Sequence, residues 1–131
     1  MANAVYPKFK EALLAGNTDL TGNIKAVLVD TADYTYDAAH EFLDDVAAGA
    51  RIGTTGNLSG KTYTNGTFDA TDASIEGAAG DESEALILYV DSGVEGTSYL
   101  ICYLDSYTGF PVQENPGDVN ITWPGGGIFS L

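Results

Sequence analysis

The sequence predicts a mainly β fold: a β-sandwich or barrel-like set of antiparallel sheets, with one or two short N-terminal helices. After Gly49, short alternating apolar and polar segments follow one another between Gly, Asn and Asp turns. About seven to nine such segments at this spacing are typical of sandwiches and barrels. Sixteen glycines, eight tyrosines and five phenylalanines fit the same class, because glycine forms tight turns and aromatic residues favour strands.

The length and the apolar content indicate one domain. The chain has 131 residues, within the range of about 100–150 residues that domains most often have. Apolar residues make up 44% of it, which is enough for a core. We predict an N-terminal docking segment over residues 1–22, followed by a single β-rich domain over residues 23–131.

Two short helices and a strand are predicted in the first part of the chain. Residues 7–15 read as a helix, because proline suits a first turn and Gly16 can end it. Residues 23–30 read as an apolar strand. Asp37 can cap a second helix over residues 38–46, whose apolar residues recur at helical spacing.

The rest of the chain is predicted to form short strands. Asn65-Gly66 is a strong signal for a two-residue hairpin turn. The predicted strands cover residues 50–54, 61–64, 67–70, 73–78, 85–90, 97–104 and 119–123, and residues 128–129 add a last short pairing.

The charge is strongly acidic and unevenly distributed. All five basic residues lie at or before position 61, so residues 62–131 carry eleven acids and a formal charge of -11. The first 61 residues carry -3, which completes the net charge of -14. A purely acidic half has nothing to neutralise phosphates, and an anionic membrane surface would repel it. We therefore predict a soluble protein that binds neither nucleic acid nor a membrane.

The residues that usually carry catalysis are scarce. His40 is the single histidine and Cys102 the single cysteine, too few for a His/Cys zinc site. No nucleophile accompanies His40 within its predicted helix, and the apolar run around Cys102 indicates a buried thiol. A small hydrolase with paired carboxylates is disfavoured, because a chain without long loops has little material for a cleft. We predict that the protein is not an enzyme and has no cofactor or metal.

Two binding alternatives stay open at this point. The acidic loops Asp30-x-x-Asp33-x-x-x-Asp37 and Asp91-Ser-Gly-Val-Glu95 offer oxygen ligands for Ca²⁺, but neither has EF-hand spacing, and solvated loops are more common. A tyrosine-rich surface for sugar or protein is the second alternative, although most tyrosines of a β protein belong to the core. Its candidates are Tyr34, Tyr36, Tyr63, Tyr99, Tyr103 and Tyr107.

Three stretches together resemble a family of small tailed-phage virion proteins, the head decoration or cement proteins. They are residues 24–36 (IKAVLVDTADYTY), residues 38–45 (AAHEFLDD) and the ending over residues 118–131 (DVNITWPGGGIFSL). The likeness covers most of the chain from Asn23 onward. It implies a β-rich fold, oligomers that are often trimers, a place on the outside of an icosahedral shell, and no catalysis.

This resemblance implies a virion structural protein that binds the outer surface of the phage head and stabilises it. The expected partners are the major capsid protein and further copies of the chain in a homotrimer. Synthesis in the host cytoplasm and assembly onto the outer capsid surface are expected. The alternative is a module of the tail or fibre that binds host surface carbohydrate through aromatic residues.

The capsid contact is expected in the less acidic N-terminal part. Basic residues with aromatic neighbours suit the interface of an acidic protein, and the candidates are Tyr6, Lys8, Phe9, Lys10 and Lys25. The alternative is that Phe9, Leu13 and Leu14 pack on the protein's own β body while the lysines stay solvated. The apolar ending Ile128-Phe129 is a candidate for contact between copies.

Overall fold

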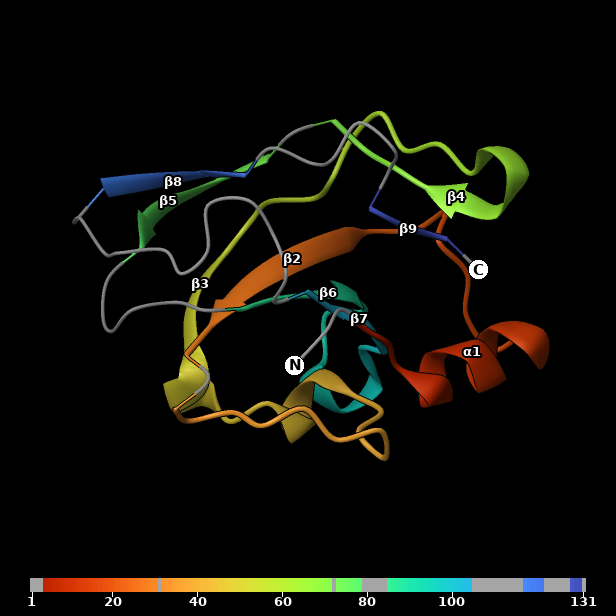
Figure 1. Cartoon of the computed structure of the whole chain (residues 1–131), viewed down its shortest axis with the longest axis horizontal. Coiled ribbons are helices and arrows are strands. Elements are labelled where there is room, and N and C mark those ends of the chain that lie inside the picture. The colour runs from red at the N-terminus through yellow and green to blue at the C-terminus, as the bar shows by residue number, and fades with distance from the viewer. Residues whose placement is uncertain are drawn as a thin grey trace.

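A five-stranded antiparallel sheet forms the centre of the molecule (Figure 1). The computed structural model describes residues 4–30, 32–71, 73–78, 85–104, 117–121 and 128–130. Strand order across the sheet is β1-β7-β6-β2-β3. The strands are β1 (Ala4–Val5), β2 (Ile24–Val29), β3 (Arg51–Thr54), β6 (Ala85–Val90) and β7 (Leu100–Leu104). The predicted mainly β fold is confirmed.

Two short antiparallel ladders lie above one face of this sheet in Figure 1. One pairs β4 (Thr67–Phe68) with β9 (Phe129–Ser130), and the other pairs β5 (Ala73–Ala78) with β8 (Gly117–Ile121). The pairing of the described strands leaves β1 and β3 as the edges of the central sheet. A mainly β architecture is therefore established, whereas a sandwich or barrel does not follow from this pairing.

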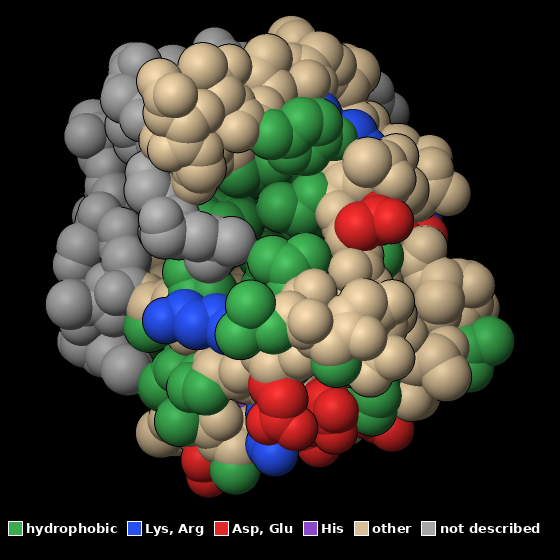
Figure 2. Space-filling view, turned by 90° about the vertical axis from the view of Figure 1, so that its right-hand side faces the viewer, with side chains coloured by type: hydrophobic (Ala, Val, Ile, Leu, Met, Phe, Trp, Pro, Cys, Tyr) green, Lys and Arg blue, Asp and Glu red, His purple; other side chains and the backbone are tan. Residues whose placement is uncertain are grey.

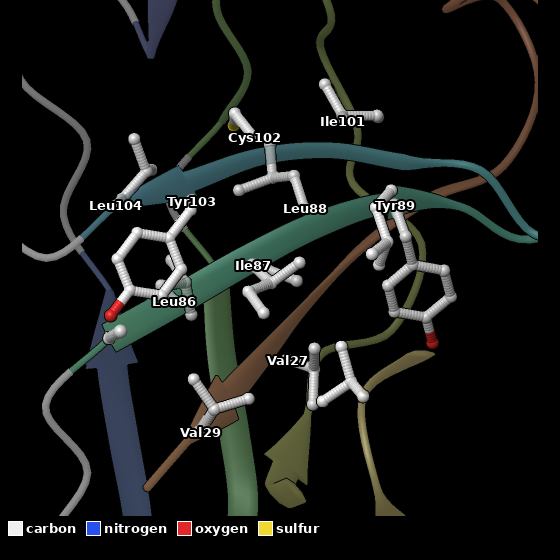
Figure 3. Close-up of a cluster of buried hydrophobic side chains, with 14 of the residues drawn as sticks. Val27, Val29, Leu86, Ile87, Leu88, Tyr89, Ile101, Cys102, Tyr103 and Leu104 are labelled. Atoms are coloured by element: carbon white, nitrogen blue, oxygen red, sulfur yellow. The ribbon is translucent and has the colours of Figure 1, made fainter. Parts of the chain in front are cut away.

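The three inner strands are buried on both faces. Residues of β2, β6 and β7 are nearly all buried, and such continuous apolar runs are expected of strands covered on both sides. Ile87 lies opposite Val27 on one neighbour and Tyr103 on the other, so these side chains share one face. Figure 3 shows them in a row across the three strands. The ring of Tyr103 lies against Tyr34 and Tyr36, so the chain after β2 covers this face.

The N-terminal residues belong to the same core. Strand β1 pairs with β7, and the N–H of Tyr6 donates to the carbonyl of Ile101 at 3.0 Å. Helix α1 (Pro7–Leu14) follows, close to its predicted bounds. It ends where Gly16 takes a φ of +76°, which favours glycine. The residues of the predicted docking segment from position 4 onward thus pack on the β domain.

The second predicted helix, over residues 38–46, is wrong. Asp37 does start a turn, because its carboxylate accepts the N–H of Ala39 at 2.8 Å. The chain then becomes extended, and Phe42 forms a β-bridge with Tyr99. Only one short 3₁₀ turn, Leu43–Asp45, remains. Pairing with a distant strand has overridden the local helical pattern.

The hairpin at Asn65-Gly66 is confirmed. Asn65 has φ 54° and ψ 33°, and Gly66 has φ +78°, as a two-residue type I′ turn requires. Thr62 and Asp69 exchange two backbone hydrogen bonds across it. The strand expected over residues 61–64 contributes only this bridge, because β4 pairs with β9 instead.

Other strand predictions differ at their ends. Strand β7 begins at Leu100 rather than 97, because residues 95–97 form a 3₁₀ turn. Strand β8 begins at Gly117 rather than 119. The end of that predicted strand, residues 122–123, lies outside the described residues. The strands expected over residues 73–78 and 85–90 have their predicted bounds.

Candidate functional site

An apolar pocket opens on the face of the molecule that carries α1, β4 and β9. Figure 2 views this face, where hydrophobic side chains gather in a central recess. The pocket has a volume of about 90 Å³. Because a cavity of about 150 Å³ can hold benzene, this one accepts a smaller group, such as a branched aliphatic side chain. We call it the aromatic pocket; its lining residues are Leu20, Tyr63, Gly66, Thr67, Phe68 and Phe129.

Three segments far apart in the sequence build this pocket. Leu20 comes from the connection between α1 and β2, Tyr63 and Phe68 from the hairpin, and Phe129 from β9. The Tyr63 hydroxyl donates to the Leu20 carbonyl at 2.8 Å. The Phe68 ring lies 5.9 Å from the Tyr63 ring and 5.4 Å from the Phe129 ring, measured between centroids. The I′ turn therefore positions the hairpin, and the aromatic stack fixes β9 against it.

The lining of the aromatic pocket is almost wholly apolar. Its described lining residues contribute no carboxylate, imidazole or amine, and the Tyr63 hydroxyl is already bound to Leu20. Small-molecule sites usually add a few converging polar groups to an apolar wall. This pocket therefore suits an apolar side chain better than a sugar or a reacting group.

The charges around the aromatic pocket nearly cancel. Lys61 donates to the carbonyl of Gly22. The Asp19 carboxylate accepts hydrogen bonds from the hydroxyl and from the N–H of Thr21. These bonds, the one from the hydroxyl most of all, hold the pKa of Asp19 below its usual range. Among the described residues, three bases and three acids belong to α1, to the connection between α1 and β2, and to the hairpin: Lys8, Lys10, Lys61, Glu11, Asp19 and Asp69. On a chain of charge -14, this is a face where an acidic partner meets little repulsion.

The structure separates the residues predicted to contact a capsid. Tyr6 and Phe9 are fully buried, so neither can anchor a partner while the fold is intact; this corrects the expectation of exposed aromatic anchors. Lys8 pairs with Glu11 on α1, and Lys10 is exposed on the same helix. Their role in binding stays a prediction.

Lys25 lies apart from these lysines, on central strand β2. Its amine forms an ion pair of 2.8 Å with Asp91. This hydrogen bond raises the pKa of Lys25 and lowers the pKa of Asp91. Lys25 is therefore engaged within the fold. The alternative packing of α1 holds in part, because Phe9 is buried and Leu13 half-buried, while Leu14 is 90% exposed.

The described tyrosines do not form a common surface. Most of the described ones are buried or half-buried and pack on one another, with the Tyr6 and Tyr36 ring centroids 5.0 Å apart. Tyr63, 45% exposed, is the one that reaches the aromatic pocket. Of the other candidates, Tyr34 and Tyr103 are buried, Tyr36 and Tyr99 are half-buried, and Tyr107 lies outside the described residues.

A buried hydrogen-bond chain joins two of these tyrosines to His40. The hydroxyls of Tyr6 and Tyr34 lie 2.7 Å apart, and the Tyr34 hydroxyl lies 2.8 Å from Nδ1 of His40. Burial raises the pKa of Tyr34 to about 12 and the pKa of Tyr6 well above its usual range, so both hydroxyls are neutral. His40 is half-buried in a turn, not on the predicted helix. These hydrogen bonds link the N-terminal segment to the residues after β2.

Replacing Tyr34 by phenylalanine is expected to lower the free energy of unfolding by about 1–3 kcal/mol, because the buried Tyr6 hydroxyl loses its partner. Tyr6→Phe should cost less, since Tyr34 keeps His40. The double variant Tyr6→Phe/Tyr34→Phe should cost less than the sum of the two. Urea unfolding of the four proteins measures this coupling, and strictly additive losses would show that the hydroxyls do not act as a pair.

The acidic loops offer no metal centre within the described residues. No group of three or more His, Cys, Asp or Glu there is placed to hold an ion. Asp91 is bound to Lys25 and Glu95 to Arg51, while the buried Asp30 accepts the N–H of Ala32. Cys102 is buried, and burial raises the pKa of its thiol to about 12.

Leu20 and Phe68 were not predicted from the sequence as site residues. The available signal was weak: Leu20 is an apolar residue within the polar stretch of residues 16–23. Its contact with Tyr63 depends on how the hairpin returns over the sheet, which no local pattern encodes. Phe129 was singled out as an apolar ending, and it is half-buried in the pocket wall, whereas Ile128 is buried.

Comparison with models of known protein families finds no match to the chain, and a comparison with curated protein sequences finds none either. Among the described residues, no helix has the length and apolar character needed to cross a membrane.

Proposed function

We propose that the protein is a virion structural protein that decorates the outer surface of a phage head as a homotrimer and stabilises the shell. Its partners are the major capsid protein and further copies of itself. The observation that carries the proposal is the aromatic pocket on a face whose charges nearly cancel, in a chain of charge -14. Such a face suits docking to a protein.

The size and charge of the protein fit this role. A protein of 13.7 kDa offers each neighbour a small contact area, so a single contact is expected to be weak. Many copies on one shell act together and need only modest affinity each. The acidic remainder of the chain keeps unbound copies soluble and apart.

Carbohydrate binding by a tail or fibre module is the second candidate. The exposed ring of Tyr63 favours it, because aromatic rings stack on sugars. The almost wholly apolar lining of the aromatic pocket favours protein docking instead. A glycan array with the isolated protein separates the two candidates, since the decoration proposal expects no selective glycan.

The decoration proposal is tested by co-sedimentation with shells assembled without the protein. The wild-type protein should saturate such shells, and Lys8→Gln/Lys10→Gln should weaken binding at least about tenfold at low salt. A control with the same change in net charge is Asn57→Glu/Ser59→Glu, because both residues are exposed and lie outside α1. We expect the control to weaken binding less than about threefold.

One result would contradict decoration, and another would contradict α1 as the contact with the shell. Wild-type protein that does not sediment with undecorated shells rules out decoration. Equal weakening by both double variants shows that net charge matters and that α1 is not the contact. Truncation of the N-terminal segment is unsuitable as a test, because it removes the buried Tyr6 and Phe9.

A further inference from the structure

Leu14 is an apolar side chain exposed at the end of a docked helix. The buried side of α1 carries Phe9 and Ala12, and the opposite side carries Pro7, Lys10, Glu11 and Leu14 at helical spacing. Leu14 is 90% exposed. One exposed leucine is ordinary, so its meaning depends on what else lies on this face.

The aromatic pocket supplies a complement to Leu14. Helix α1 and the pocket belong to the same face of the molecule (Figures 1 and 2). The pocket is apolar, has a volume of about 90 Å³ and is bordered by the exposed Tyr63 ring. A branched aliphatic side chain is the kind of group that its shape and lining accept. The chain therefore presents both halves of an apolar contact.

The charges next to these two features are complementary as well. Lys10 precedes Leu14 by one helical turn on the same side of α1, and it is exposed. Asp19 adjoins Leu20 of the pocket wall and is also exposed. Neither forms an ion pair within the part of the chain that the structure describes. Approach of one copy to another with Leu14 over the pocket would place a cation near an anion.

We propose that the aromatic pocket of one copy receives Leu14 of a second copy of the chain, with Lys10 of the second copy beside Asp19 of the first. This deepens the proposed homotrimer and rests on that proposal. In a trimer this contact runs head to tail, from Leu14 of each copy to the aromatic pocket of the next, and is therefore heterologous. Contacts of this kind close into rings when the rotation between copies allows it, as a trimer needs.

Sedimentation velocity at tens of micromolar protein tests the contribution of Leu14. The wild-type protein should form an oligomer, and Leu14→Asp should raise its dissociation constant at least about tenfold, because a carboxylate cannot enter an apolar pocket unpaired. Val94→Asp is the matched control, since Val94 is 62% exposed and lies in the connection between β6 and β7. It should leave the dissociation constant within about twofold. Circular dichroism verifies that each variant is folded.

Disulfide cross-linking tests whether the pocket is the receiving site. Leu14→Cys and Thr64→Cys are made in separate chains with different tags, because Thr64 is exposed beside Tyr63. The native Cys102 is buried and should not interfere. Oxidation of the mixture should join the two tagged chains, whereas Leu14→Cys with Val94→Cys should give only background.

The outcomes separate this inference from the proposed function. A monomeric wild-type protein, an unchanged oligomer in Leu14→Asp, or equal cross-linking to positions 64 and 94 would overturn the Leu14 contact. None of these bears on saturation of shells by the wild-type protein, which tests decoration by itself; Lys8→Gln/Lys10→Gln does not separate the two, because Lys10 belongs to both proposed contacts. An oligomer that depends on Leu14 but ignores shells would support the contact and contradict the decoration proposal.

Discussion

Replacement of Phe9 by alanine is expected to lower the free energy of unfolding by about 3–5 kcal/mol. The Phe9 ring is fully buried and belongs to the cluster that includes Tyr6 and the central strands. Removing it leaves a cavity that the β sheet cannot fill without moving. The backbone before α1 is also paired with β7, so the loss should weaken the docking of the whole N-terminal segment. Equilibrium unfolding in urea measures the change.

Lys10→Ala is the matched control, because it makes the same substitution one position away. Lys10 is exposed, and alanine is a good helix former, so the change should stay within about 0.5 kcal/mol. A loss for Phe9→Ala as small as that of the control would mean that residues 4–14 form a separable arm. A loss of the expected size means that this segment is part of the domain.

Local sequence patterns correctly predicted the elements whose conformation is set by residues adjacent in the sequence. The apolar run over residues 85–90 became β6 with the expected bounds, because a continuous apolar strand is stable wherever both its faces are covered. Asn65-Gly66 formed its turn because both residues tolerate positive φ. Helix α1 was predictable from its proline start and glycine end.

The false helix over residues 38–46 shows where local signals fail. Its start formed as expected, with the Asp37 carboxylate bound to a backbone N–H. Residues 41–43 then pair with the start of β7 and the two residues before it: the N–H of Leu43 donates to the carbonyl of Ser98 at 2.8 Å, and the N–H of Leu100 donates to the carbonyl of Glu41 at 2.9 Å. If residues 38–46 formed a helix, the carbonyl of Ser98 and the N–H of Leu100 would lose these backbone partners. Nothing within the segment itself encodes the presence of that strand.

The sequence predicted the charge near the candidate site but not the residues that form the aromatic pocket. The lower acidity of the N-terminal part was visible in the sequence, and it marks the face that carries α1. The aromatic pocket was not visible, because Leu20, Tyr63 and Phe129 meet only through the hairpin and β9. Tyr6 and Phe9 were predicted as anchors because aromatic residues next to lysines resemble an interface. Their burial follows from the pairing of β1 with β7, a long-range contact.

Arg51→Met is expected to lower the free energy of unfolding by about 2–3 kcal/mol. Arg51 begins β3, and its guanidinium donates to the carbonyls of Val46 and Leu43 and to the carboxylate of Glu95. It therefore fastens the turn before β3 to the edge of the central sheet. Methionine keeps much of the side-chain volume but leaves the Val46 carbonyl without its donors. Urea unfolding at neutral pH checks the value.

Two further variants decide whether the carbonyl contacts or the ion pair carries the effect. Arg51→Lys keeps the charge, but a point charge on a flexible stem cannot reproduce the planar fork that reaches several oxygens; we expect it to recover less than half of the loss. Glu95→Gln removes the ion pair while Arg51 keeps its carbonyls, and its effect should be much smaller than that of Arg51→Met, because Glu95 lies largely in solvent. The pKa of Glu95 is lowered by the hydrogen bond from Arg51. What the pair contributes to stability is therefore fully present above the ordinary carboxyl pKa and is lost as the pH falls from there through the lowered pKa. Full recovery by lysine, or an equal loss in Glu95→Gln, would assign the effect to the ion pair instead.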